Sequence, residues 1–147
     1  MFSNCTSLVT APELPATTLD FYCYEGMFQN CTSLTEAPEL PATELAEYCY
    51  YEMFRGCTSL TTAPALPAET LVSSCYSYMF YDCSNLTSVK ASFITAPSTT
   101  YTNCWLGRVS SEGTFYYNPE AKWVKNIERG INTVPDGWTL TAYEEVS

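Results

Sequence analysis

A motif of the form Met-Phe-x-x-Cys-[Thr/Ser]-[Ser/Asn]-Leu occurs four times in this chain, beginning at Met1, Met27, Met53 and Met79. Consecutive copies begin 26 residues apart. A constant period of this length is typical of chains in which one structural unit stacks on copies of itself and contacts only its neighbours. The motif therefore constrains the architecture before it says anything about chemistry.

Comparison of the copies separates constant positions from variable ones. We expect the constant apolar positions to form buried ladders, which are Leu8, Leu34, Leu60 and Leu86, then Leu14, Leu40 and Leu66, then Leu19, Leu45 and Leu71. The variable positions suit a solvated outer face, and they are Phe21, Glu47 and Ser73, then Glu25, Tyr51 and Ser77, then Gln29, Arg55 and Tyr81. Function is expected at positions that vary between copies.

Each unit reads as a short strand followed by a helix. In the second copy the strand is predicted over residues 33–37, and Pro38 ends it because proline has no N–H to donate. A helix is predicted over residues 43–53, with Thr43 as its N-cap. Leu45, Cys49 and Met53 are four residues apart, which places them on one helix face.

The motif, followed by Leu-Pro-Ala-Thr and the next Met-Phe, resembles the BspA-type leucine-rich repeats, whose motif is approximately Ala-Phe-x-x-Cys-x-x-Leu. The resemblance covers residues 1–90, with methionine in place of alanine and a longer unit. It implies a right-handed coil with parallel strands on one face and short helices on the other. Members of this family are typically surface or secreted bacterial proteins implicated in adhesion, and similar repeats occur in virion proteins of gut bacteriophages.

We therefore predict an α/β solenoid of the leucine-rich-repeat kind over residues 1–104, with units starting at residues 1, 27, 53 and 79, the last irregular. Residues 105–147 are predicted to form a C-terminal cap, rich in aromatic side chains and short strands, that covers the open end of the core. The first motif begins in the middle of a unit, so we expect the chain to be a fragment of a longer protein.

Two interpretations of the eight cysteines stay open. Buried cysteine behaves as a small hydrophobe, so the first interpretation is stacked free thiols. The second is one disulfide per unit, and sequence cannot fix the connectivity. One pairing joins Cys5–Cys23, Cys31–Cys49, Cys57–Cys75 and Cys83–Cys104, and a rival pairing leaves Cys5 and Cys104 over.

Composition excludes several classes of function. The formal net charge of −10 disfavours binding to nucleic acid. No stretch approaches the roughly 20 apolar residues of a membrane helix, so no membrane insertion is expected. The chain has no histidine, which removes the commonest general base and zinc ligand. We predict no enzyme activity, no metal and no cofactor.

The remaining prediction is a non-catalytic binding or adhesion module of a bacterial surface or secreted protein, located outside the cell or on its surface. Its partner would be a protein or a glycan. The alternative is a structural or receptor-binding part of a bacteriophage virion. Recurring tyrosines either form a binding strip or cover the seam between units, and the tryptophans beyond residue 104 either form a carbohydrate platform or are buried. The candidate ligand contacts are Ser33, Thr35, Glu36, Tyr51, Thr61, Thr62 and Trp105.

Overall fold

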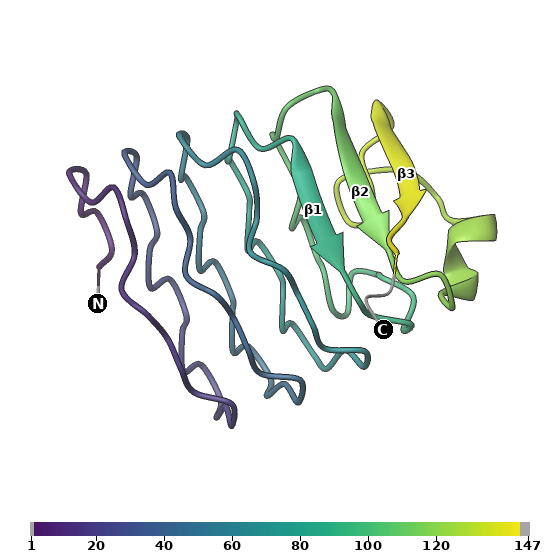
Figure 1. The fold of residues 1–147 in the computed structure, drawn as a ribbon, viewed down its shortest axis with the longest axis horizontal. Coiled ribbons are helices and arrows are strands. Elements are labelled where there is room, and N and C mark those ends of the chain that lie inside the picture. Colours follow the sequence, from purple (N-terminus) through teal and green to yellow (C-terminus); the bar gives the residue numbers. More distant parts are fainter. Residues whose placement is uncertain (1, 145–147) are drawn as a thin grey trace.

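The computed structural model describes residues 2–144 of the 147-residue chain. Its named elements are strand β1 (Ser88–Ala91), strand β2 (Gly113–Tyr117), the 3-10 helix η1 (Lys122–Asn126) and strand β3 (Trp138–Ala142). The three strands form one parallel sheet in the order β1-β2-β3. The rest of the described chain consists of turns and extended segments that lie side by side between the N-terminus and this sheet (Figure 1).

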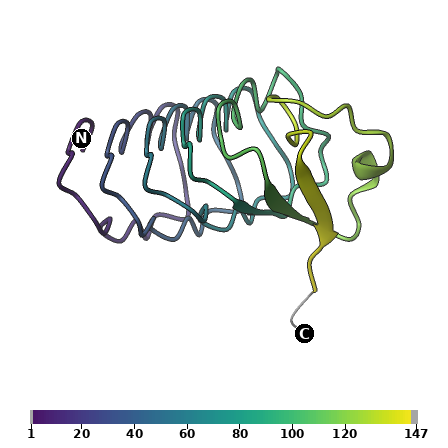
Figure 2. The same ribbon diagram turned by 90° about the horizontal axis from the view of Figure 1, so that it is seen from above.

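Backbone hydrogen bonds join each segment to the segment about one repeat length further along the chain, and we call these segments layers. On one side of the molecule the Tyr50 N–H donates to the Cys75 carbonyl at 3.1 Å. On the other side the Ala63 N–H donates to the Ser88 carbonyl at 2.9 Å, and an isolated parallel bridge pairs Thr62 with Ser88. Figure 2 shows the turns and the strands on opposite sides of the molecule.

The predicted α/β solenoid of strand–helix units is wrong. Residues 2–144 contain no α-helix, and η1 is their only helical element. The predicted strand over residues 33–37 is reduced to an isolated bridge between Thr10 and Glu36. The predicted helix over residues 43–53 is extended at its start and continues as a run of turns. The molecule is therefore built mainly from turns and loops around a small parallel sheet, and a leucine-rich-repeat solenoid does not describe it.

Alternating hydrogen bonds explain why this run is not helical. The Met53 N–H donates to the Tyr50 carbonyl at 3.1 Å, which closes a four-residue turn within the layer. The next N–H, that of Phe54, donates instead to the Met79 carbonyl of the following layer at 2.9 Å. An α-helix would keep all of these bonds within one segment. Here every second N–H leaves the segment and binds its neighbour.

The spacing of the layers favours this arrangement over a helix. Neighbouring strands lie about 4.8 Å apart, whereas a helix with its side chains is about 10 Å wide. A layer with a strand on one side and a helix on the other must therefore fan apart on the helical side. The Phe28–Phe54 and Phe54–Phe80 ring centroids are each 5.6 Å apart, close to the strand spacing. Tandem turns thus allow both sides of the layers to pack at similar distances.

The core consists of like side chains stacked from layer to layer. The rings of Phe28, Phe54 and Phe80 stack nearly parallel and are fully buried. Tyr50 and Tyr76 stack in the same way at 5.9 Å. The other columns contain the fully buried residues Cys31, Cys57 and Cys83, Cys49 and Cys75, Met53 and Met79, and Leu34, Leu60 and Leu86. Burial of each large apolar side chain contributes about 1.5–3 kcal/mol, so these columns are the main source of stability.

Strands β2 and β3 lie within the segment predicted to be a cap. Strand β2 pairs in parallel with β1, placing Phe115 beside Val89, and β3 then pairs with β2, placing Leu140 beside Phe115. Phe115, Trp105 and Trp138 are buried, and the Phe93 and Trp105 rings are 5.9 Å apart. Parallel pairing of layers therefore continues into the segment beyond residue 104.

The tandem turns require backbone in the left-handed region at every fourth residue. In one layer these residues are Tyr48, Glu52 and Gly56, with φ of 58°, 56° and 78°. Each occupies the third position of a turn, where type II geometry requires a positive φ. Gly56 has a second reason to be glycine, because a Cβ there would collide with the Oδ1 of Asn30 in the preceding layer.

We expect Gly56→Ala to destabilise the protein by about 3 kcal/mol, because left-handed strain of about 1–2 kcal/mol adds to the collision with Asn30. Gly26→Ala is the matched control, since Gly26 has a φ of 59° but its Cβ would meet only the flexible end of Gln29, at 3.3 Å. In an Asn30→Gly background the cost of Gly56→Ala should fall to that of Gly26→Ala. Urea unfolding measures the loss of stability in each of these three cases. Equal losses for Gly56→Ala and Gly26→Ala in the wild-type background would contradict this packing.

Candidate binding site

A strip of tyrosines covers the outer side of the tandem turns across successive layers. It consists of five residues, which are Tyr22, Tyr48, Tyr51, Tyr78 and Tyr81. Each ring contacts the next. The centroid distances along this order are 4.7, 5.4, 5.9 and 5.6 Å. We call this surface the tyrosine strip.

A four-residue alternation in the sequence positions these rings outward. Cys49 and Tyr50 are buried, Tyr51 and Glu52 are partly exposed, and Met53 begins the next buried pair. Tyrosines in the inward pair belong to the core, as Tyr50 does, and tyrosines in the outward pair belong to the strip. The recurring tyrosines therefore divide into two groups. Those at inward positions pack in the core, and those at outward positions form an exposed strip that could bind a partner.

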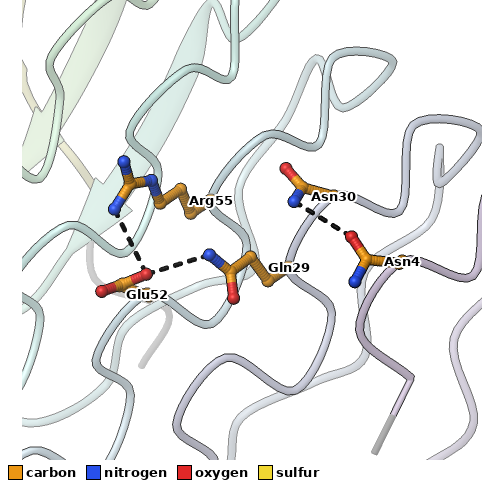
Figure 3. Close-up of polar contacts among 5 residues, drawn as sticks. All are labelled: Asn4, Gln29, Asn30, Glu52 and Arg55. Atoms are coloured by element: carbon orange, nitrogen blue, oxygen red, sulfur yellow. Dashed lines mark hydrogen bonds and ion pairs between the residues drawn. The ribbon is translucent and has the colours of Figure 1, made fainter.

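Arg55 contributes the cation of the strip. Its guanidinium carbon lies 5.6 Å from the Tyr78 ring centroid and 5.1 Å from that of Tyr81. Its Nη1 also forms an ion pair with Glu52 at 3.3 Å, and the Gln29 amide donates to the same carboxylate oxygen at 3.0 Å (Figure 3). These contacts hold the Arg55 guanidinium over the two rings, at cation–π distance, and compensate its charge locally.

The hydroxyls of Tyr51 and Tyr78 stay protonated at neutral pH. Partial burial raises the pKa of Tyr51, and the nearby Glu52 carboxylate raises it further. A hydrogen bond with the Cys104 thiol raises the pKa of Tyr78. Both phenols therefore keep a neutral hydroxyl beside an apolar ring, which suits contact with a mixed polar and apolar surface.

A row of side-chain contacts between layers fixes the edge of the strip. The Asn30 Nδ2 donates to the Asn4 Oδ1 at 3.1 Å (Figure 3). Three layers further on, Arg108 forms an ion pair with Asp82 at 3.0 Å. Because these side chains are exposed, each contact contributes at most about 1 kcal/mol to stability.

The candidate ligand contacts predicted from sequence are distributed over three places. Thr35, Glu36, Thr61 and Thr62 are exposed on the strand side and Ser33 is partly buried there. Tyr51 belongs to the tyrosine strip. Trp105 is fully buried, with its Nε1 donating to the Thr133 carbonyl at 2.8 Å, so its side chain is not available to a ligand.

Of the strand-side candidates, Thr62 lines a shallow cavity of about 620 Å³ together with Lys90 and Tyr143. The Lys90 Nζ lies 4.9 Å from the Tyr143 ring centroid. The sequence did not indicate this cavity, because it combines residues of distant layers. Tyr78 was not singled out either, whereas Arg55 and Tyr81 were recognised as variable outer positions.

All eight cysteines are free thiols in the structure, as in the free-ladder interpretation. The Cys57 thiol donates to the Phe28 carbonyl of the preceding layer at 3.1 Å, and that of Cys83 donates to the Phe54 carbonyl at 3.0 Å. Burial raises the pKa of Cys49, Cys57 and Cys75 from 9.0 to about 12. These thiols are unreactive core groups, because the thiolate is the nucleophilic form.

Two features are absent from the described part of the chain. Between residues 2 and 144, no group of three or more acidic, cysteine or histidine side chains could hold a metal ion. Within the same range, no helix has the length and apolar character required to cross a membrane.

Comparisons of the chain with protein-family models, with curated proteins and with solved structures gave no match. The resemblance to BspA-type repeats therefore stays a prediction from the motif.

We expect thiol-specific labelling of the folded protein at pH 8 to modify Cys5 and Cys23 rapidly and Cys104 more slowly, because the first two are exposed and the third is partly exposed. The other five should react only after denaturation. Mass spectrometry counts the labels. A total below eight in denaturant without a reducing agent would favour the disulfide interpretation.

We expect the free energy of unfolding to decrease between pH 9 and pH 11. Below pH 9 the buried thiols are protonated in both states. Above it only the unfolded chain loses their protons, which costs about 1.4 kcal/mol per pH unit for each of Cys49, Cys57 and Cys75. Cys57→Ala should lower this slope by about 1.4 kcal/mol per pH unit, the share of one thiol, and Cys5→Ser should leave it unchanged. Stability that is constant over this range would contradict the buried-thiol assignment.

Proposed function

We propose that this chain is a non-catalytic binding module that contacts a partner protein through the tyrosine strip. The observation that carries the proposal is the continuous outer row of five tyrosines, each packed on the next. Tyrosine and arginine are enriched at protein interfaces and among the residues that dominate binding energy. The adhesion role implied by the resemblance, with a location outside the cell or on its surface, fits such a surface.

The packing of the strip favours binding at a low entropic cost. Immobilising a flexible side chain at an interface costs about 0.5–1.5 kcal/mol. Tyr51 is already held between Tyr48 and Tyr78, and Tyr78 is held between Tyr51 and Arg55. A partner that lies on these rings therefore orders little that is not ordered already.

The end of the strip nearest the N-terminus offers the largest exposed aromatic area. Phe21 is 65% exposed and Tyr22 is 51% exposed, and they are neighbours in the chain. Exposed large aromatic side chains that continue a packed aromatic row are typical of interaction sites rather than of the general surface. The partner surface should be apolar or basic, because the chain carries a net charge of −10.

We expect Phe21→Ser/Tyr22→Ser to weaken binding to a partner protein at least tenfold, because the double variant removes Tyr22, the most exposed ring of the strip, together with its exposed neighbour Phe21. The probe is a panel of purified extracellular-matrix proteins, measured by biolayer interferometry. Val9→Ser is the control, since Val9 is also exposed, at 53%, but lies outside the strip. A panel without any binder, or a bound protein whose affinity is unchanged in the double variant, would contradict the proposal.

A further inference from the structure

A cavity of about 560 Å³ opens beside η1, between residues 96–99 and residues 123–133. It forms where the layers depart from their regular stacking. Over most of the chain, the stacked rings of successive layers are in direct contact. Here η1 replaces tandem turns, and the chain extends outward at the end of the molecule (Figure 1). The volume lies within the range of about 300–1,000 Å³ that is typical of small-molecule sites.

Trp123 provides the aromatic wall of this cavity. One face of its indole stacks on Phe93, with the centroids 5.6 Å apart and the planes 22° from parallel. Phe115 contacts the indole edge-on at 6.1 Å, and the indole Nε1 donates to the Phe93 carbonyl at 3.3 Å. The ring is therefore held rigidly and its one donor is in use. It is partly exposed and lines the cavity, in contrast to the buried Trp105 and Trp138.

Planar polar side chains line the same cavity as this ring. The Asn132 Oδ1 accepts the Cys104 N–H at 2.7 Å, which orients the amide and leaves its NH₂ group available. The Arg129 Nη1 donates to the Trp138 carbonyl at 2.8 Å, which fixes the guanidinium. No described residue forms a hydrogen bond with the side chains of Asn126 or Glu128, which also line the cavity. Donors and acceptors are thus both present around one apolar surface.

The chemistry of the lining selects a class of ligand. One carboxylate and one guanidinium leave the cavity without net charge, which disfavours phosphates and other multiply charged ligands. The polar side chains disfavour a purely apolar ligand, because their hydrogen-bonding groups would be buried without partners. A pyranose ring has an apolar face that stacks on an indole and hydroxyls that both donate and accept. We propose that this cavity binds a neutral saccharide, with a sugar ring stacked on Trp123.

This site is separate from the tyrosine strip, so the two proposals succeed or fail independently. Of the tryptophans that the sequence suggested as a carbohydrate platform, only Trp123 is in a position to contact a sugar. Trp105 and Trp138 are core residues whose Nε1 atoms donate to the Thr133 and Ser110 carbonyls. Trp123 alone of the three combines partial exposure with a place on a cavity wall.

The test uses the whole chain with an array of neutral oligosaccharides built from glucose, galactose, mannose and N-acetylglucosamine. Calorimetry and tryptophan fluorescence then measure the affinity of any sugar that binds. We expect a dissociation constant in the millimolar to micromolar range. Trp123→Ala should weaken binding at least tenfold, and Glu128→Ala should weaken it severalfold. Glu128 is exposed, so its replacement should preserve the fold even if the loss of Trp123 does not.

Phe21→Ser/Tyr22→Ser is the matched control, and it should bind the sugar as the wild type does. Retained binding in both Trp123→Ala and Glu128→Ala would overturn the assignment of the site. Absence of binding to every oligosaccharide at millimolar concentration would overturn the proposal itself. Loss of sugar binding in the control variant would also overturn it, because it would place the sugar on the tyrosine strip.

Discussion

The structure depends on how the backbone N–H groups of the tandem turns are divided between hydrogen bonds within a layer and hydrogen bonds to the next layer. Within the tandem turns, alternate N–H groups close a turn in their own layer, and the others bind the next layer. The turn from Tyr50 to Met53 and the bond from Phe54 to Met79 show both kinds side by side. Without the second kind, the turns would have no fixed distance to their neighbours. With it, stacked side chains such as Phe54 and Phe80 are held in register.

The magnitudes explain why the chain tolerates so many residues with positive φ. A non-glycine residue in the left-handed region costs about 1–2 kcal/mol. Each four-residue unit contains one such residue and forms four backbone hydrogen bonds, two within the layer and two to the next layer. Each bond contributes a net of about 0.5–1.5 kcal/mol, so the four together offset the strain. The buried pair in the same unit, such as Met53 and Phe54, then supplies the net stabilisation.

The sequence predicted which residues share a column better than it predicted the backbone. Leu34, Leu60 and Leu86 are all fully buried, as a ladder at constant spacing requires. The helix was mispredicted because Leu45, Cys49 and Met53 are four residues apart. Over so few residues a period of four in tandem turns cannot be told from the period of 3.6 in a helix. A better signal was the arrangement in pairs, with Cys49 and Tyr50 inward and Tyr51 and Glu52 outward.

The candidate site was less predictable, because it depends on contacts between layers. The exposure of Tyr51 followed from its variable position, but its packing against Tyr78 joins different columns of neighbouring layers. Trp105 was considered for a ligand because of its residue type and place in the chain, and neither reveals that its indole lies against Phe93 and Phe115. Burial at the end of a stack depends on which later segments of the chain cover it.

The regularity of the layers decides what kind of ligand each surface can take. A backbone that repeats at constant spacing produces flat sides, and a flat side carrying Tyr22, Tyr51 and Arg55 suits a partner with an extended surface of its own. Enclosing a small molecule requires concavity, and the cavity beside η1 lies where the chain departs from tandem turns. Trp123 is held at that departure by Phe93, a residue of the regular core. The irregular end thus has a rigid wall because it rests on the ordered stack beneath it.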